Sequence, residues 1–404
     1  MGKVGVVVVG LNGAVATTVV AGVELMTRGL VPRIGMVTES TDAKLGPTPT
    51  DFAEFVPLED LVFAGWDVRG GNMFASALHH KVLPPEMLEH AREALEARHP
   101  WPAVFSTEYA ENVRGDHKVV AKSHRDEIQT LESNIVSFRE KHRLDRLVMV
   151  NLASTERFLE MASVHRTLPD FEAGLDRSDP EITPAMRYFY VANRLRVPYC
   201  NFTPSLTNIP ALAQQAEAQG NPFAGMDGKT GQTLLKTALA PMMRTRRLHI
   251  EGWYSTNILG NNDGLVLDSP SSNKTKVMSK ASVLDSIVGY HVENHQVHIH
   301  YYRPRGDSKE AWDNIDLVGF AGIQMQLKVN FLCQDSALAA PLVLDLVRLL
   351  DLAKRVGERG IQRQLSMFFK SPYHAPGETA VHDIFQQERL LLDWLHARGR
   401  NATL

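Results

Sequence analysis

The chain opens on Val4-Gly5-Val6-Val7-Val8-Val9, followed at once by Gly10-Leu11-Asn12-Gly13-Ala14-Val15-Ala16. An apolar, β-branched run of this kind is typical of a strand buried on both faces of a parallel sheet. Helix-forming residues continue to about Met26, so the stretch predicts a strand, a glycine turn and a helix. A dinucleotide-binding turn requires this order, because its glycines let the backbone approach a pyrophosphate at a helix N-terminus.

The glycine turn departs from the usual fingerprint. The first glycine of the triplet is missing, and Ala16 stands near the place of the third. A tight turn that binds nothing is the alternative interpretation. If the turn binds a dinucleotide, the contact residues are Gly10, Asn12, Gly13 and Ala14.

The composition limits the class of protein. A length of 404 residues predicts two domains, and 44% hydrophobic with 22% charged residues is typical of a globular protein. The formal charge of -3 indicates no general attraction to nucleic acid. Two distant cysteines, Cys200 and Cys333, predict no disulfide framework. We expect a cytoplasmic protein, since no apolar stretch is long enough to span a membrane and glycines interrupt the N-terminal run.

Strands and helices alternate through the first 245 residues, which predicts a doubly wound α/β domain of the Rossmann type. Further strands are predicted at Arg33–Glu39, Ala103–Phe105, Leu147–Val150 and Val197–Asn201, and helices at Pro84–Arg98, Ala121–His142 and Pro210–Gln219.

Polar residues follow several of these strands. Glu39 or Asp42 lies where an acid can accept ribose hydroxyls, and a surface turn is the alternative. Asp67 ends an apolar run, either beside the dinucleotide or as a helix cap. Ser154 and Thr155 suit a strand-to-helix turn, where ligands of such sheets bind.

A second glycine-rich stretch runs from Gly225 to Thr233 and opens a helix to about Met243. The run Thr230-Gly231-Gln232-Thr233 at a helix N-terminus is suited to an anion, with Lys229 as added charge. The alternative is an ordinary cap made by Asp227 or Thr230.

The pattern changes from about Leu248. His295–Arg303 and Ile323–Phe331 alternate apolar and polar residues, which predicts a mostly antiparallel sheet with one buried face. Such a sheet tends to meet a partner, so we expect an oligomer. His298 and His300 could ligate a metal, but a polar strand face explains them better.

The predicted domains are therefore residues 1–245, 246–334 and 335–404. The last segment contains predicted helices at Ala337–Arg355 and Glu378–Arg398, which we expect to return to the first domain. We expect the middle segment to be an α+β insertion used for catalysis and oligomerisation.

The lysines and loops between Asn257 and Lys309 indicate a polar ligand. The loop Asn257-Ile258-Leu259-Gly260-Asn261-Asn262-Asp263-Gly264 precedes Lys274, Lys276 and Lys280, and Gly306-Asp307-Ser308-Lys309 closes the stretch. A solvated loop beside a charged face is the alternative. Clustered lysines depress one another's pKa and stabilise alkoxide or enolate charge. With a dinucleotide turn, they suggest oxidation of a phosphorylated polyol or sugar.

These residues together resemble the myo-inositol-1-phosphate synthase family, over nearly the whole chain. The matching blocks are Gly10-x-Asn12-Gly13, Gly65-Trp66-Asp67, Ser154/Thr155-Glu156-Arg157, Lys229-Thr230-Gly231-Gln232-Thr233, Leu259-Gly260-Asn261-Asn262-Asp263-Gly264, Lys276-x-x-Ser279-Lys280, Gly306-Asp307-Ser308-Lys309 and Asp335-Ser336.

The resemblance implies an NAD-dependent isomerase of glucose 6-phosphate, working in inositol and phospholipid biosynthesis. In that family NAD+ oxidises C5, the resulting enolate closes the ring on C1 in an aldol step, and the bound NADH reduces the ketone. The product is inositol 3-phosphate, and the family architecture implies a homotetramer.

The resemblance also implies roles for single residues. The catalytic group is Lys276, Lys280, Lys309 and Lys370; the substrate group is Thr230, Gly231, Gln232, Thr233, Asn257, Leu259, Asn261 and Asp263. The cofactor group is Gly10, Asn12, Gly13, Ala14, Asp67, Ser154, Thr155, Asp227, Asp307 and Asp335. No metal ligand is assigned, and a monovalent or divalent cation stays open as a second requirement.

The chain departs from the family pattern at Phe202, Leu206 and Met226, which stand where small, polar or acidic residues are usual. These departures leave two alternatives open: an NAD-dependent cyclase or dehydrogenase of another phosphosugar, and a non-catalytic NAD-binding oligomer. Retention of all four lysines argues against a dehydrogenase with net turnover and against the non-catalytic protein.

Overall fold

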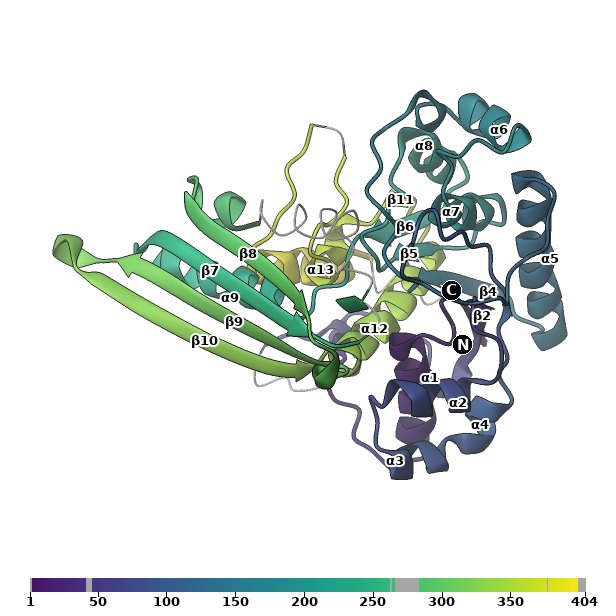
Figure 1. The fold of residues 1–404 in the computed structure, drawn as a ribbon, viewed down its shortest axis with the longest axis horizontal. Coiled ribbons are helices and arrows are strands. Elements are labelled where there is room, and N and C mark those ends of the chain that lie inside the picture. Colours follow the sequence, from purple (N-terminus) through teal and green to yellow (C-terminus); the bar gives the residue numbers. More distant parts are fainter. Residues whose placement is uncertain (1, 41–45, 262–263, 266–282, 376, 399–404) are drawn as a thin grey trace.

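A computed structural model describes residues 2–40, 46–261, 264–265, 283–375 and 377–398. Its first part is a seven-stranded sheet with helices on both faces (Figure 1). The strand order is β11-β6-β5-β4-β1-β2-β3, and every neighbouring pair is parallel. The strands are β1 (Val4–Val9), β2 (Leu61–Asp67), β3 (Trp101–Pro102), β4 (Arg146–Asn151), β5 (Tyr199–Asn201), β6 (Pro222–Gly225) and β11 (Gly360–Ile361).

The β1 strand occupies the centre of this sheet, as the opening stretch predicts. All six of its residues are buried, and it pairs with β2 on one side and β4 on the other. The chain continues from β1 outwards to β2 and β3, and it then returns to the other side of β1 with β4. The crevice between β1 and β4 is therefore the topological switch point where such sheets bind ligands. The prediction of a doubly wound, Rossmann-type domain is confirmed.

Helices cover the two faces of the sheet. They are α1 (Ala14–Thr27), α2 (Met73–His80), α3 (Pro85–His90), α4 (Arg92–Glu96), α5 (His124–His142), α6 (Leu168–Asp176), α7 (Pro184–Arg194) and α8 (Pro210–Ala218). The predicted helix Pro84–Arg98 is split into α3 and α4.

The predicted strand Arg33–Glu39 is wrong. The structure has a 3-10 turn at Val37–Glu39, and the sheet partner of β1 is β2, further along the chain. The carboxylate of Asp345 accepts the backbone N–H groups of Val37 and Thr38, both at 2.9 Å, so a side chain satisfies donors that a strand would pair. Glu39 forms an ion pair with Arg348 at 2.5 Å, and the alternative Asp42 lies outside the described residues.

The short strand predicted at Ala103–Phe105 is displaced. The structure places β3 at Trp101–Pro102, and Ala103 makes only an isolated bridge to Lys118.

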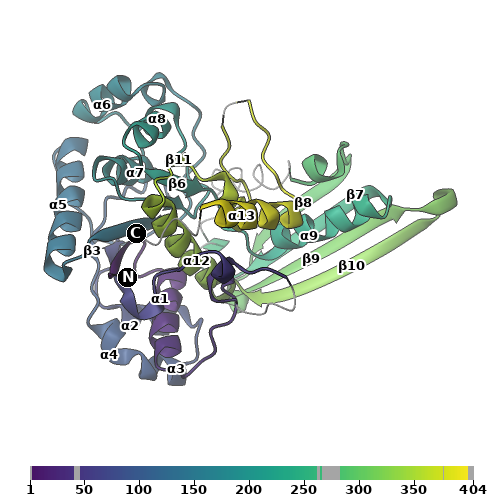
Figure 2. The ribbon, with the colours of Figure 1, turned by 180° about the vertical axis from the view of Figure 1, so that it is seen from behind.

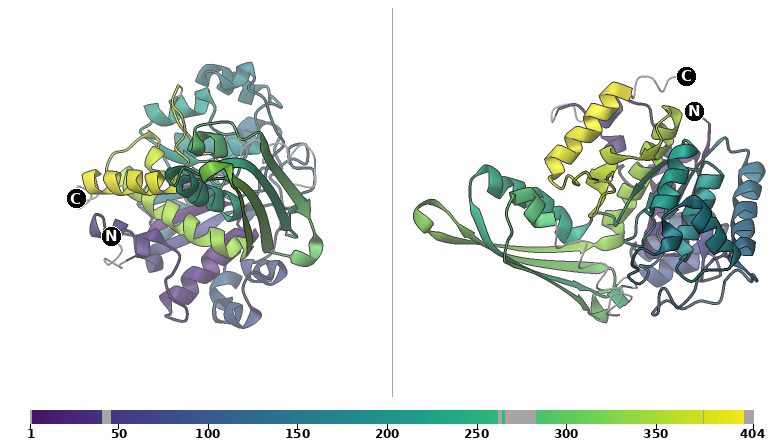
Figure 3. Two further views of the ribbon diagram at one scale, coloured as in Figure 1. Left: turned by 90° about the vertical axis from the view of Figure 1, so that its left-hand side faces the viewer. Right: turned by 90° about the horizontal axis from the view of Figure 1, so that it is seen from above.

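The second part is a four-stranded sheet in the order β10-β9-β7-β8. Its strands are β7 (His249–Leu259), β8 (Asn294–Tyr301), β9 (Ser308–Val318) and β10 (Gln324–Gln334). β7 pairs antiparallel with β9 and β9 with β10, while β7 and β8 are parallel. The sheet projects away from the first part as a long arm, which Figure 3 shows from two further sides.

The inner face of this arm is covered by α9 (Gly231–Thr245). Ala240 and Met243 of α9 pack with Trp253, Ile315 and Leu317 of the sheet in one buried cluster. The opposite face of the sheet carries exposed aromatic residues, among them Tyr254 and Trp312.

Two long helices complete the chain. α12 (Asp335–Arg355) packs against α1 and β4, and its buried leucines and valines join the core of the first part. α13 (Ile384–Arg398) packs against the 3-10 segment Arg363–Phe368 and against α9. Figure 2 shows α12 and α13 between the two sheets. None of the helices in the described part of the chain is long and apolar enough to cross a membrane.

Candidate active site

Two adjoining pockets lie at the carboxyl ends of the parallel strands. The first follows the ends of β1, β2 and β4, and the second continues over the ends of β5 and β6 to β9 and α12. Gly13, His80, Ala153 and Ser154 line both pockets. One extended ligand can therefore pass from the first pocket over the glycine turn into the second.

The glycine turn has the geometry that close contact with a ligand requires. Gly10 has a φ of +93°, and a Cβ there would lie 3.0 Å from the carbonyl oxygen of Leu152. The following helix begins with Gly13 as its N-cap and Ala14 as its first residue, and it has no side-chain cap and no acid in its first turn. Its N-terminal N–H groups and positive dipole end are thus available to a pyrophosphate.

Asp67 and Asn12 hold this turn in place. The Asp67 carboxylate accepts backbone hydrogen bonds from Asn12 at 2.8 Å and from Arg69 at 2.9 Å. The Asn12 side chain donates to the carbonyl of Arg69 at 3.0 Å. Burial raises the pKa of Asp67 and these backbone donors oppose the rise. Asp67 thus stands at the end of β2, where an acid meets the ribose in related sheets.

His80 is a site residue that the sequence analysis missed. A ring nitrogen, Nε2, lies 2.8 Å from the carbonyl oxygen of Asn12, and the ring lines both pockets. Burial lowers its pKa, which favours the neutral ring. No spacing in the sequence links His80 to the turn, because the contact joins residues 68 positions apart.

Ser154 and Thr155 follow β4 at the edge of the sheet, but they lie in an irregular segment and not in the strand-to-helix turn that the sequence predicts, because the next helical element begins only at Ser163. Ser154 lines both pockets and Thr155 lines the second. The neighbouring Glu156 has a structural contact, because its carboxylate accepts the backbone N–H of Ala185 at 2.9 Å.

Lys370 and Asp227 form a buried ion pair in the second pocket. Lys370 Nζ lies 2.8 Å from Asp227 Oδ1, and each residue is 3% exposed. The backbone of Lys370 also donates to the Asp227 carbonyl at 2.7 Å. Asp227 has a φ of +61°, a strained conformation for a residue other than glycine, and such strain is concentrated at functional sites.

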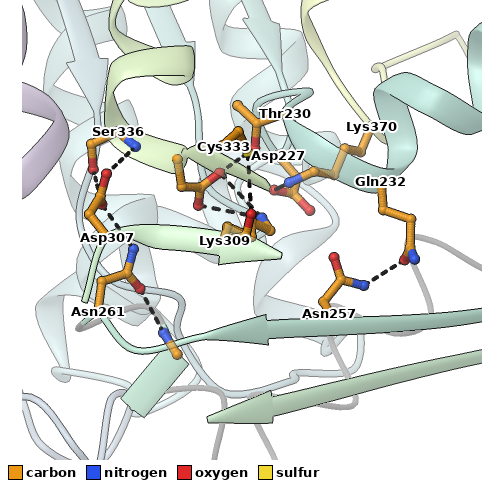
Figure 4. Close-up of polar contacts among 12 residues, drawn as sticks. Asp227, Thr230, Gln232, Asn257, Asn261, Asp307, Lys309, Cys333, Ser336 and Lys370 are labelled. Carbon is orange, nitrogen blue, oxygen red and sulfur yellow. Dashed lines mark hydrogen bonds and ion pairs between the residues drawn. The ribbon is translucent and has the colours of Figure 1, made fainter. Parts of the chain in front are cut away.

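Lys309 occupies the opposite side of the same pocket, beside the N-terminus of α9 (Figure 4). Its Nζ lies 3.3 Å from Asp335 Oδ1, which also accepts the Thr230 hydroxyl at 2.8 Å. Gly231 has a φ of +59°, and a Cβ there would lie 3.4 Å from Lys309 Cε. Glycine at position 231 therefore permits the positive φ of the turn and leaves room for the Lys309 side chain.

The third acid, Asp307, holds the start of α12. It accepts the Ser336 backbone N–H at 2.9 Å, the Ser336 hydroxyl at 2.7 Å and the Asn261 amide at 3.1 Å. Burial raises the pKa of Asp307 above its usual value, and the hydrogen bonds from Ser336 and Asn261 oppose part of this rise. Asn261 and Ser336 line the second pocket, so Asp307 orients groups that face the ligand.

The remaining substrate-group residues in the described part of the chain are buried, and none of them lines either of the two pockets. Gln232 and Thr233 belong to that turn, and Asn257 and Leu259 lie on β7. Asn257 Nδ2 donates to Gln232 Oε1 at 2.6 Å. The first turn of α9 has no side-chain cap and no acidic residue, which suits an anion.

Lys229 does not add its charge to that turn as the sequence analysis expected. Its Nζ donates to Gln387 Oε1 near the start of α13, and burial lowers its pKa to about 7. The predicted catalytic residues Lys276 and Lys280 and the predicted substrate residue Asp263 lie outside the described residues.

A family model for NAD-binding myo-inositol-1-phosphate synthases matches residues 4–396 of the chain. The chain belongs to this family. An inositol-3-phosphate synthase of Bacteroides thetaiotaomicron is 40% identical to it, over 96% of this chain and 94% of that protein. A rice inositol-3-phosphate synthase is 28% identical, over 98% and 86% of the two chains.

Solved structures of synthase family members have the same fold. The inositol-3-phosphate synthase of Caenorhabditis elegans, 25% identical, superimposes with a TM-score of 0.91 over 98% of this chain and 86% of that one. A synthase-related protein of Thermotoga maritima, 22% identical, superimposes with a TM-score of 0.77 over 97% and 98%.

One departure from the synthase family pattern lies directly in the second pocket. The Phe202 ring lines it beside Gly228, where a Cβ would lie 2.1 Å from the ring. Leu206 and Met226 pack against the core on the other side of the sheet. Phe202 therefore narrows the pocket, whereas the other two departures do not line it.

Proposed function

We propose that the protein is an inositol-3-phosphate synthase that converts D-glucose 6-phosphate to 1D-myo-inositol 3-phosphate. The observation that carries this proposal is the pairing of Lys309 with Asp335 and of Lys370 with Asp227 in a pocket continuous with the glycine turn. Each carboxylate fixes the position of the lysine side chain next to it. Two fixed ammonium groups beside a dinucleotide site suit a reaction that develops negative charge on substrate oxygens.

The residues of the first pocket fit NAD. Gly10, Asn12, Gly13 and Ala14 would face the pyrophosphate, and Asp67 the ribose; Ser154 and Thr155 would contact the cofactor where the two pockets meet. NAD, when bound there, supplies the oxidation at C5 of the sugar and the later reduction of the same carbon.

Residues of the first turn of α9 and of the end of β7, of which Thr230 and the nearby Asn261 line the second pocket, would hold and polarise the sugar. The substrate phosphate would bind at Thr230, Gly231, Gln232 and Thr233, because the N-terminus of α9 offers N–H groups and a positive dipole end. Asn257, Leu259, Asn261 and Asp263 would orient the hydroxyl groups and the ring. Asp227, Asp307 and Asp335, which the sequence analysis grouped with the cofactor, would instead hold Lys370, Asn261 and Lys309.

The chemistry then follows from the lysines. Lys309 and Lys370 would stabilise the oxyanions of the aldol step, a contribution that in other enzymes amounts to about 3–4 kcal/mol per donor. Lys276 would carry the proton at the C5 oxygen and Lys280 would support it, by their positions in the family motif.

We further propose a cytoplasmic homotetramer. The exposed aromatic residues on the outer face of the four-stranded sheet support association, and the cysteines Cys200 and Cys333 are both free thiols. No group of three His, Cys, Asp or Glu side chains suited to a metal occurs in the described ranges, so we assign no residues to a cation.

The deciding experiment is phosphorus NMR of glucose 6-phosphate incubated with the protein and substoichiometric NAD+, with the absorbance of NADH followed in parallel. We expect complete conversion to inositol phosphate without accumulated NADH. NADH formed in proportion to the sugar consumed would instead establish a dehydrogenase. Absence of any turnover would refute the proposal and direct attention to Phe202 and to other phosphosugars. Addition of a chelator or of ammonium to the same assay measures a cation requirement.

A further inference from the structure

A chain of buried polar side chains leads from the four-stranded sheet to the first turn of α9, next to Thr230, which lines the second pocket. Asp313 of β9 accepts a hydrogen bond from Gln232 Nε2 at 3.1 Å, and Gln232 Oε1 accepts one from Asn257 Nδ2 at 2.6 Å. All three residues are at most 3% exposed. Figure 4 shows Gln232 and Asn257 beside the cluster of Lys309, Lys370 and Asp227.

The direction of these hydrogen bonds follows from the indole of Trp253. Trp253 Nε1 lies 2.6 Å from Asp313 Oδ1 and can only donate, so this oxygen is an acceptor. Gln232 must therefore turn its amide nitrogen towards Asp313 and its oxygen towards Asn257. A carbonyl oxygen accepts only, so Asn257 must present its own nitrogen to Gln232.

The same constraint leaves the oxygen of Asn257 on the side away from Gln232. Asn257 Oδ1 is buried and has no hydrogen-bond partner among the residues that the structure describes, in contrast to most buried acceptors. Leaving a buried acceptor unsatisfied is costly, so a hydrogen-bond donor from a ligand would stabilise Asn257 Oδ1. A carbonyl oxygen attracts a hydroxyl hydrogen and repels phosphate and ketone oxygens.

We propose that Asp313 is a positioning residue which, through Gln232, commits Asn257 to accept a hydrogen bond from one hydroxyl group of the phosphosugar. This inference rests on the function proposed above and adds a selectivity device to it. Asp313 itself acts at a distance, since Gln232 and Asn257 lie between it and the sugar.

A buried lysine balances the charge of Asp313. Lys236 lies one helical turn after Gln232 on α9 and is 1% exposed. Its Nζ lies 2.6 Å from His295 Nε2 and 5.7 Å from the centre of the Trp253 ring. The relay thus has a lysine near its sheet end, while Asp313 Oδ2 and Asn257 Oδ1 are both without a hydrogen-bond partner among the described residues.

Three variants separate the orienting role of Asp313 from its packing role. Asp313→Leu removes the acceptor and frees Gln232 to rotate. Asp313→Asn keeps an oxygen opposite Trp253, since the indole still only donates, and so preserves the direction of the relay. Ser255→Ala removes another hydrogen bond to Asp313 Oδ1, of 2.7 Å, but leaves Gln232 and Asn257 in place.

The measurement is calorimetric binding of glucose 6-phosphate and of its 2-, 3- and 4-deoxy analogues to the NAD-loaded enzyme. We expect the wild type, Asp313→Asn and Ser255→Ala to bind one particular analogue about tenfold more weakly than glucose 6-phosphate. Asp313→Leu should bind glucose 6-phosphate about tenfold more weakly than the wild type does, and should no longer distinguish that analogue from it.

The outcomes are separable. Equal discrimination by Asp313→Leu and the wild type, or loss of discrimination in Ser255→Ala as well, overturns the inference while leaving the proposed function intact. Failure of the wild type to bind glucose 6-phosphate at all overturns the proposed function, and the inference with it. If Asp313→Leu does not fold, the smaller Asp313→Ala removes the same acceptor and is held to the same expectation.

Discussion

Lys309 and Lys370 are oriented by carboxylates that come from distant parts of the chain. Asp335 begins α12 and Asp227 follows β6, and the ammonium–carboxylate distances are 3.3 Å and 2.8 Å. A lysine held in this way loses little further freedom when the substrate binds, which favours stabilisation of a developing oxyanion.

Replacement of Lys309 by Met should reduce turnover by about 10²- to 10³-fold, because one fixed positive group at the oxyanion is lost. Asp335 keeps its hydrogen bond from Thr230, so we expect the fold to persist. Steady-state turnover and the thermal unfolding midpoint are the two measurements. Lys141→Met, an exposed lysine on α5, is the matched control and should leave both unchanged.

Lys229 should make the stability of the protein depend on pH. Its pKa is lowered by burial from 10.5 to about 7, so between these values the unfolded chain binds more protons than the folded one. The free energy of unfolding therefore rises with pH across this window, by at most about 1.4 kcal/mol per pH unit.

Urea unfolding of the wild type and of Lys229→Met at pH 7.5 and pH 9 tests this slope. The variant should gain distinctly less stability between the two pH values, whereas Lys141→Met should follow the wild type. Identical slopes for wild type and Lys229→Met would show that Lys229 remains charged in the folded protein.

We expect cofactor binding to depend on the glycine turn between β1 and α1. Gly10→Ala places a Cβ 3.0 Å from the Leu152 carbonyl oxygen in a backbone conformation with positive φ. We expect a loss of about 1–3 kcal/mol in the free energy of unfolding and a weaker Kd for NAD, both measured on the purified protein.

Gly29→Ala is the matched control for that substitution. Gly29 has a φ of +70° but a Cβ there would meet no atom within 4 Å, and the residue lies at the far end of α1. It should lower stability without changing NAD affinity. Equal weakening of NAD binding in both variants would mean that the effect comes from global stability and not from the turn.

Most elements could be predicted because their sequence period matches their environment. β1 is apolar on both faces, and β10 was recognised by its alternation. Arg33–Glu39 could not be assigned correctly, since the Asp345 carboxylate that satisfies its backbone donors lies more than 300 residues away. The residues around Arg33–Glu39 give no indication of a hydrogen-bond partner so distant in the sequence.

The outer face of the four-stranded sheet should determine the assembly of the whole molecule. Tyr254 and Trp312 are 48% and 50% exposed on it, and the rings of His298 and His300 stack at 6.2 Å. We expect light scattering after size exclusion to give four times the mass of one chain. Trp312→Asp should lower that mass, because a charge would be buried in the interface.

Val120→Asp is the control for this prediction, since Val120 is fully exposed but lies in the first part of the molecule. A wild-type mass equal to one chain would contradict the tetramer. A Trp312→Asp variant with unchanged mass would place the subunit contact elsewhere.

The sequence alone was sufficient for the parallel sheet, the glycine turn after β1 and the family, because these depend on short-range apolar runs and on motifs within a few residues. The pairing of Lys309 with Asp335, the contact of His80 with Asn12 and the relay from Asp313 to Asn257 required the folded chain. The physical reason is that a side chain's orientation, hydrogen-bond direction and pKa are set by neighbours in space, and these neighbours come from different elements.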